Sequence, residues 1–382
     1  MNASVSEGAV AEHEVFARLR QAARAAGMDA LVALSQDNVT YTAGFLVPSH
    51  ATNRFRRTIS VLAGERFACQ IVVSVEEAQA KARSRFKDVR PYDQFNQDAA
   101  DLLADALIEA GAAGGTIGIE MDFLPAQDFL RLKERLPDAR FVACKDLYFE
   151  ARMRKTAEEI ATLRRVGELT ESVMREVFAR IRPGMTELEI ASQLMTGMIE
   201  GGSTNVKYRV GSGVNGSVTN CGTTDKKLEP GDIVRIEVLG DLDNYRSNVT
   251  RTLVVGKPQD RHRDIYARLI DAREQCKAML RPGLAVRELY LKYVQVCRGH
   301  GIEPTLRFLG HGIGQTIHEE PYITDSRDIV FAPNFTFTME PLYMLPGDAG
   351  FHTEDMYTIT ANGFEHITGT IVNNDSLIEV GK

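Results

Sequence analysis

The feature that most constrains the fold of this 382-residue chain is a near-repeat in its C-terminal part. One long helical pattern ends at Arg182-Pro183-Gly184-Met185, and a later one ends at Arg281-Pro282-Gly283-Leu284. Each is followed by a second helical pattern, a glycine-rich loop and two strands. Because the order of elements repeats as well as the helix ends, we expect two similar halves, with two sheets packed in pseudo-twofold symmetry around a shared cleft. The loops are expected at 209–213 and 307–312, and the strands at 233–239, 249–255, 335–340 and 354–360.

The predicted strands place polar side chains on the cleft side of the sheets. In the strand 335–340, apolar residues alternate with polar ones, and Glu340 lies on the polar face. If the halves correspond, Glu237 matches Glu340, and Asn248 matches Glu354. Three converging carboxylates are typical of a metal site, an acid/base site or an ion-pair network, and solvated strand ends are the remaining alternative.

The N-terminal part alternates short apolar runs with helical patterns, which is typical of an α/β domain. A capping box formed by Thr156 and Glu159 then begins a long amphipathic helix, and the domain boundary is placed just before it. The predicted organisation is therefore an N-terminal α/β domain at 1–152 and a second domain at 153–382, in an α+β chain.

Charge and composition exclude several classes of protein. The chain has 45 Lys and Arg against 52 Asp and Glu, a net charge of −7, and no long run of like charges, so nothing indicates nucleic-acid binding. No window reaches the roughly 18 apolar residues that a membrane span needs, and the N-terminus lacks a signal-peptide pattern, so a cytoplasmic protein is expected. The five cysteines form no CxxC pair and are expected to be reduced thiols.

Five spaced motifs carry a resemblance to a known family. They are Leu228-Glu-Pro-Gly-Asp-Ile-Val-Arg-Ile-Glu237, Tyr245-Arg-Ser-Asn248-Val-Thr-Arg251-Thr, Gly310-His311-Gly-Ile-Gly314 with His318-Glu319-Glu320-Pro321, Phe337-Thr-Met-Glu340-Pro341, and Glu354-Asp355. In this order they resemble the creatinase/prolidase/aminopeptidase P family, and the segment from Met28 to Phe45 is similar to the family's smaller N-terminal domain. The resemblance implies a pseudo-symmetric "pita-bread" catalytic domain behind an N-terminal α/β domain.

Peptidases of that family hold two divalent metal ions with two Asp, one His and two Glu. By resemblance the His and both Glu are His311, Glu340 and Glu354, but Glu237 and Asn248 stand at the two Asp positions. An amide in place of a carboxylate removes one negative charge and one bidentate ligand, so a dinuclear centre is not expected. The expected cofactor is either none or one divalent ion, Mn, Zn or Fe.

Catalytic roles follow from the same residues. Without metal, Glu340 and Glu354 would repel each other, which raises at least one pKa and gives a base for water and an acid for the leaving nitrogen. With a metal, His311 is a ligand and His318 is a substrate contact or proton relay.

Two further positions depart from the family pattern. Asn220 stands where most members, creatinase included, have a titratable His, and we expect it to contact the substrate. His352 replaces an Arg that is common two residues before the last Glu, and it is either a new substrate contact or a plain strand residue.

A basic segment of the N-terminal domain suggests the substrate class. Phe55 and Arg57 match the spacing of a Phe and an Arg that reach across the creatinase dimer to the substrate carboxylate. An arginine fork suits a carboxylate, so a homodimer and a small carboxylate-bearing substrate are expected, although a solvated basic face is the alternative.

The leading hypothesis is a creatinase-type hydrolase that cleaves a C–N bond of a small carboxylated amide, amidine or dipeptide without a dinuclear metal centre. The first alternative is a one-metal Xaa-Pro dipeptidase. The second is a non-catalytic family member that binds a ligand or partner.

Overall fold

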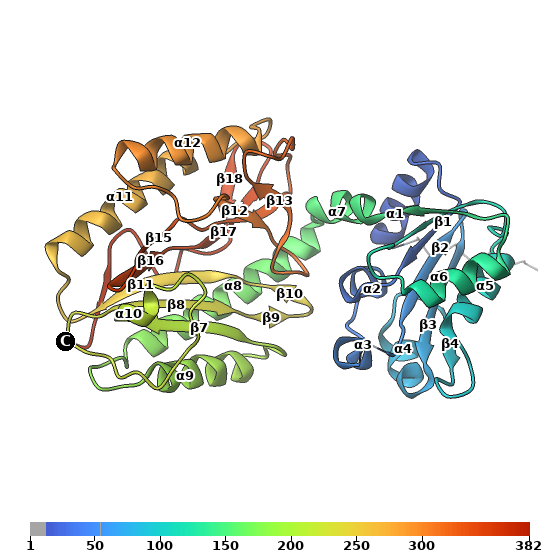
Figure 1. Cartoon of the computed structure of the whole chain (residues 1–382), viewed down its shortest axis with the longest axis horizontal. Coiled ribbons are helices and arrows are strands. Elements are labelled where there is room, and N and C mark those ends of the chain that lie inside the picture. The colour runs from blue at the N-terminus through green and yellow to red at the C-terminus, as the bar shows by residue number, and fades with distance from the viewer. Residues whose placement is uncertain (1–12, 54) are drawn as a thin grey trace, which may run out of the picture. The chain divides into compact units, whose positions relative to one another are not determined.

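The computed structural model describes residues 13–53 and 55–382, which form two compact units that divide between Ala151 and Arg152 (Figure 1). Each unit has its own hydrophobic core.

The N-terminal unit is built on one six-stranded sheet of order β4-β3-β2-β1-β5-β6. The pairs β1/β2 and β2/β3 are antiparallel, whereas β3/β4, β1/β5 and β5/β6 are parallel, so this is the expected α/β arrangement in mixed form. Apolar side chains pack on both faces of the sheet. The strands are β1 (Ala30–Ala33), β2 (Ile59–Ala63), β3 (Phe67–Val73), β4 (Asp88–Tyr92), β5 (Thr116–Ile119) and β6 (Arg140–Ala143). The helices are α1 (Glu14–Ala25), α2 (Gln36–Ala43), α3 (Pro48–Thr52), α4 (Glu77–Arg83), α5 (Ala99–Glu109), α6 (Ala126–Arg135) and α7 (Lys145–Met153), which crosses the division between the units.

The C-terminal unit contains the two similar halves. Its first half has α8 (Ala157–Phe178), α9 (Glu187–Glu200), β7 (Lys207–Ser212), α10 (Gly213–Gly216), β8 (Ile233–Leu239), β9 (Asp241–Leu242), β10 (Tyr245–Arg246) and β11 (Val249–Val255). Its second half has α11 (Asp260–Lys277), α12 (Val286–Gly299), β12 (Gly310–Gly312), β13 (Glu319–Ile323), β14 (Thr336–Met339), β15 (Leu342–Leu345), β16 (Ala349–His352), β17 (Asp355–Ile359), β18 (Phe364–His366) and β19 (Ile378–Val380).

The helix α8 begins as the sequence predicts. Thr156 Oγ1 accepts a hydrogen bond from the backbone N–H of Glu159 at 3.1 Å, and the Glu159 carboxylate accepts one from the backbone N–H of Thr156 at 2.6 Å. This reciprocal capping box satisfies two N–H groups that the helix itself leaves unpaired.

Both expected glycine-rich loops differ from the structure. Within 307–312, Gly310–Gly312 is the strand β12, paired with β13 and β14. Residues 209–213 do not form a glycine-rich loop, because Lys207–Ser212 is the strand β7, paired antiparallel with β8. Gly211 fits this strand because a Cβ there would lie 2.5 Å from the Cys221 sulfur. Gly211 therefore allows the segment with Gly216 and Cys221 to pack closely against the strand.

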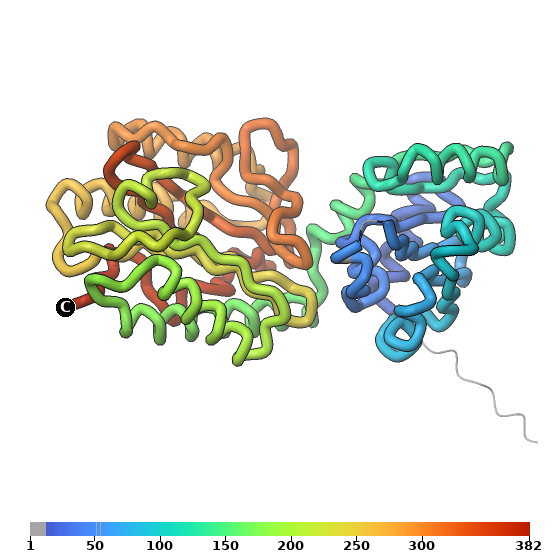
Figure 2. Tube along the Cα trace, turned by 60° about the horizontal axis from the view of Figure 1, so that its bottom comes forward, coloured from blue at the N-terminus to red at the C-terminus, as the bar shows by residue number. Residues whose placement is uncertain are grey.

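Two sheets meet at the centre of the C-terminal unit. The first has the order β19-β11-β8-β7 and the second β13-β12-β14-β17-β18. They join where Thr250 and Glu354 exchange backbone hydrogen bonds of 3.2 and 3.1 Å. Figures 1 and 2 show α8 and α9 beside the first sheet and α11 and α12 beside the second. The apolar faces of each helix pair pack against its own sheet.

Over the parts of the chain that the structure describes, no helix combines the length and the apolar character needed to cross a membrane.

Candidate active site

Three side chains converge from three strands of the second sheet. His311 lies in the middle of β12, Glu340 directly follows β14, and Glu354 directly precedes β17. The glycines beside His311 allow this approach, because a Cβ at position 310 would lie 1.9 Å from the backbone oxygen of Thr338. A Cβ at position 312 would lie 2.2 Å from the backbone oxygen of Glu320. Only glycine fits at both positions.

These three side chains form a compact, buried cage. The Nε2 atom of His311 lies 3.2 Å from Glu340 Oε1 and 3.7 Å from Glu354 Oε1. One ligand atom from each residue lies within 4.8 Å of the others, and His311 and Glu354 are completely buried. The cage joins two carboxyl groups and one imidazole, a donor set that divalent transition metals accept.

The tautomer of His311 is fixed by the backbone. Its Nδ1 atom lies 2.9 Å from the carbonyl oxygen of Gly312, so Nδ1 carries a hydrogen and Nε2 is the ring atom directed at the carboxylates. Among the described residues, His311 Nε2, Glu340 Oε1 and Glu354 Oε1 are all buried without a hydrogen-bond partner. Buried acceptors without a donor are costly, so this group of atoms fits a bound cation or a shared proton.

The two carboxylates differ in their electrostatic environments. Burial and then the negative charges of Glu340 and Glu237 raise the pKa of Glu354 well above its usual value. Burial would also raise the pKa of Glu340, but the neighbouring His311 and His352 outweigh it and lower that pKa to about 2. In the absence of metal, Glu354 is therefore the carboxyl group of the pair that takes up a proton first.

His352 and His318 lie beside the cage. His352 Nε2 is 3.4 Å from Glu340 Oε2, and its side chain is buried. The ring of His318 stacks on His311 with centroids 3.7 Å apart, while its outer part is exposed to solvent. Burial of the inner face and the adjacent His311 lower the pKa of His318 to about 4. Both histidines predicted from sequence are therefore brought to the cage.

Glu237 and Asn220 are joined by a residue that sequence reasoning missed. The guanidinium of Arg209 donates from Nη1 to Glu237 Oε2 at 2.8 Å and from Nε to Asn220 Oδ1 at 2.7 Å. Arg209 and Glu237 are direct cross-strand partners in β7 and β8. In the sequence, the only indication of this pair is that Arg209 precedes Glu237. The pairing itself depends on the register between the two strands, which cannot be read from the sequence.

Asn248 lies directly before β11, two residues from Thr250, so their side chains share one face of the strand. Its Oδ1 atom is buried and has no hydrogen-bond partner in the described part of the chain.

Thr250 is a second residue of the site that the sequence does not indicate. Its hydroxyl donates to Glu354 Oε2 at 3.0 Å and fixes that carboxylate.

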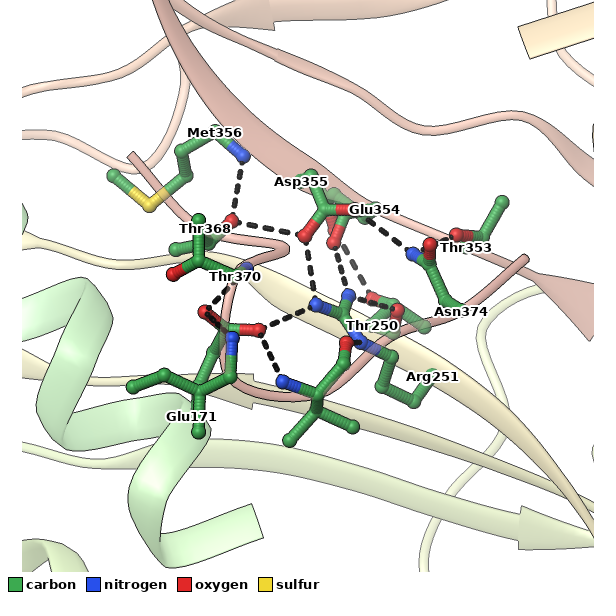
Figure 3. Close-up of polar contacts among 12 residues, drawn as sticks. Glu171, Thr250, Arg251, Thr353, Glu354, Asp355, Met356, Thr368, Thr370 and Asn374 are labelled. Atoms are coloured by element: carbon green, nitrogen blue, oxygen red, sulfur yellow. Dashed lines mark hydrogen bonds and ion pairs between the residues drawn. The ribbon is translucent and has the colours of Figure 1, made fainter. Parts of the chain in front are cut away.

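A buried ion-pair network supports Glu354 from behind (Figure 3). The completely buried Arg251 donates to the backbone oxygen of Glu354 at 2.8 Å, and to Glu171 at 2.8 Å and Asp355 at 2.7 Å. Asp355 also accepts hydrogen bonds from Thr368 at 3.0 Å and Asn374 at 2.8 Å. Arg251 therefore connects α8, β11 and β17 and holds the strand end that presents Glu354.

Phe55 and Arg57 belong to the N-terminal unit. Phe55 is 81% exposed, and Arg57 Nε lies 3.1 Å from Asp128 Oδ2. Their expected role across a dimer stays a prediction.

An open pocket of about 470 Å³ lies beside the stacked histidines and the Arg209 ion pair. Its lining residues are Val206, Lys207, Tyr208, Arg209, Glu237, Leu239, Ile317 and His318. A pocket next to a cage of one imidazole and two carboxylates is the arrangement expected of a hydrolase that holds a metal or uses acid/base groups.

Comparisons with known proteins agree with this class. The description "Metallopeptidase family M24" matches residues 161–361, and "Creatinase/Prolidase N-terminal domain" matches residues 16–154. The chain belongs to metallopeptidase family M24, and the resemblance seen in its motifs is confirmed.

Several relatives span nearly the same length. The chain is 29% identical over 354 residues to a "Probable dipeptidase PepE" of Mycobacterium bovis, covering 92% of this chain and 93% of that protein. It is 30% identical over 281 residues to an "Xaa-Pro dipeptidase" of Lactobacillus helveticus, covering 72% and 76%. A solved "Xaa-Pro dipeptidase" from Bacillus anthracis superposes with a TM-score of 0.84 at 27% identity, covering 96% of this chain and 99% of that one. These relatives confirm the pita-bread fold and the expected class of hydrolases acting on C–N bonds.

Proposed function

We propose that this chain hydrolyses the C–N bond of a small Xaa-Pro-type dipeptide, with one divalent ion held by His311, Glu340 and Glu354. A metal-free hydrolase is the second candidate. Both candidates place the chemistry at the same cage.

The observation that carries the proposal is the fixed tautomer of His311. Its Nδ1 hydrogen is directed to the backbone, so Nε2 faces two carboxylate oxygens in a buried place. Three atoms that can each donate a lone pair are costly to bury together without a cation or a proton between them. A single cation removes this cost and gives each of the three atoms a partner.

A divalent ion at this position would polarise the scissile carbonyl and lower the pKa of a water molecule bound to it. The protein side chains hold the remaining parts of the site. His352 contacts the other carboxylate oxygen of Glu340 from the one that His311 contacts, and the Thr250 hydroxyl holds Glu354. The exposed edge of His318 faces the pocket, where a ring nitrogen can bind the substrate or pass a proton to it.

The substrate class is inferred from the relatives and the pocket. The proteins from Lactobacillus helveticus and Bacillus anthracis are named Xaa-Pro dipeptidases, and this chain matches most of the length of each. A pocket of about 470 Å³ fits a small molecule of dipeptide size. We retain the predictions of a homodimer and of substrate contact by Phe55 and Arg57 as part of this proposal.

The metal-free candidate is favoured by a different observation. Burial and neighbouring charge raise the pKa of Glu354, whereas the adjacent histidines lower that of Glu340. A protonated and an ionised carboxyl group in one cage form an acid and a base for hydrolysis.

Metal analysis separates the two candidates. Protein purified without added metal is assayed for metal content and for hydrolysis of Xaa-Pro dipeptides and creatine, before and after chelation. We expect activity to disappear on chelation and to return with Mn²⁺. Undiminished turnover by metal-free protein would overturn the first candidate in favour of the second, and a lack of turnover in both states would favour a binding protein.

A further inference from the structure

We propose that the guanidinium of Arg209 supplies the second positive charge of this site, and so limits the chain to one metal ion. This inference rests on the one-metal function proposed above. It concerns the side chains next to the three-residue cage rather than the cage itself.

A continuous row of side chains crosses the two sheets. Arg209 is the direct partner of Glu237 in β7 and β8, Glu237 is the partner of Thr250 in β11, and Thr250 is the partner of Glu354 at the junction of the sheets. Direct cross-strand partners share one face and have Cβ atoms roughly 5 Å apart. The guanidinium is therefore carried on the same face that presents Glu354 to the cage.

Two hydrogen bonds fix the guanidinium of Arg209. Its Nη1 atom donates to Glu237 at 2.8 Å, and its Nε atom donates to Asn220 at 2.7 Å. The Arg209 side chain is 38% exposed and that of Glu237 is 12% exposed, so the pair is partly shielded from water. Two hydrogen bonds from different atoms of one planar group hold it in a single orientation.

Glu237, Asn220 and Asn248 all fit a site that already holds the charge of Arg209. Glu237 directs its carboxylate to the guanidinium, and Asn220 presents a neutral oxygen that accepts from the same group. Asn248 offers a neutral amide oxygen, which is buried without a hydrogen-bond partner within the described residues and can contact one cation, but it adds no negative charge to balance a second ion. The ligand set therefore fits one ion in the cage and does not fit a second ion beside a guanidinium of like charge.

Metal stoichiometry tests this inference without relying on activity. Wild-type protein and the variants N248D, N248D/R209Q and N248D/K207Q are saturated with Mn²⁺, and bound Mn²⁺ per chain is measured by titration calorimetry and elemental analysis. Lys207 provides a matched control, because it is a second cation on the same strand and lines the same pocket. Circular dichroism and thermal unfolding confirm that each variant is folded, and N248D/R209M replaces any R209Q protein that is not.

The inference predicts one Mn²⁺ per chain for the wild type, for N248D and for N248D/K207Q, and two for N248D/R209Q. Two ions bound by N248D alone would overturn the role of Arg209 while leaving the one-metal function intact. A single bound Mn²⁺ per chain in both N248D/R209Q and N248D/R209M would also overturn the role of Arg209. Failure of the wild type to bind any Mn²⁺ would instead overturn the proposed function on which the inference rests.

Discussion

The imidazole of His318 stacks on that of His311, with ring centroids 3.7 Å apart and ring planes inclined by 15°. His311 is completely buried in the cage, whereas the outer part of His318 reaches solvent at the pocket. The stack therefore connects the three-residue cage to the open pocket.

Replacement of His318 separates its chemical role from its packing role. H318F keeps an aromatic ring over His311 but removes the ring nitrogens, so we expect a stable protein with turnover reduced about 10²-fold. H318A loses both ring and nitrogens and is expected to be no more active than H318F. Steady-state kinetics on an Xaa-Pro dipeptide checks this, and full activity of H318F would show that the ring only packs.

Replacement of Glu340 tests the cage itself. E340Q keeps the shape of the side chain but removes the charge beside His311 and His352, so we expect turnover to fall about 10²- to 10⁴-fold. Glu365, which pairs with Arg164 at the surface, provides the control variant E365Q. Equal activity of E340Q and E365Q would mean that the site lies elsewhere.

Removal of Arg251 tests the support behind Glu354. R251M leaves Glu171 and Asp355 buried without their shared cation, and we expect the free energy of unfolding to fall by about 3–5 kcal/mol. Urea unfolding followed by circular dichroism measures this change. A loss below about 1 kcal/mol would show that the neighbouring hydrogen bonds hold the strand end without Arg251.

The buried Glu319 predicts a specific dependence of stability on pH. Burial would raise its pKa, but Arg152 at 2.8 Å and Lys155 at 3.2 Å outweigh burial and lower the pKa to about 2, from an ordinary 4.5. Because the folded-state pKa is depressed, this stabilisation is fully present above about pH 4.5 and is lost as the pH falls through about 2. At neutral pH this stabilisation contributes about 3 kcal/mol to the free energy of unfolding.

E319Q is therefore expected to unfold more easily than the wild type at pH 7, with a difference that shrinks as the pH approaches 2. Urea unfolding of both proteins at several pH values measures this. E303Q, which removes a carboxylate of an exposed pair with Arg298, should show no such difference. An E319Q penalty that is the same at pH 7 and pH 2 would contradict the assignment.

Much of the fold could be predicted because its signals are local. The capping box at Thr156 and Glu159 and the period of two in strand 335–340 each depend on a few neighbouring residues. By contrast, α2 was missed, although Ser35 caps it and Gly44, in the left-handed region at φ 81°, ends it. Its short polar sequence has no apolar stripe to indicate a helix.

The candidate site could be predicted only where motifs carried it. His311, Glu340 and Glu354 lie together as expected. The partnership of Arg209 with Glu237 could not be predicted, because it depends on the register of β7 against β8, and the glycines after Arg209 indicated a loop. Sequence spacing alone does not tell which charged residue faces a site from a neighbouring strand.

The most direct test of the proposed function is an anomalous difference map from crystals of the wild-type protein grown with Mn²⁺. One strong peak among His311 Nε2, Glu340 Oε1 and Glu354 Oε1 is predicted, with the guanidinium of Arg209 still bonded to Glu237. Two peaks, or no peak at that position in protein that hydrolyses the dipeptide, would contradict the proposed one-metal site.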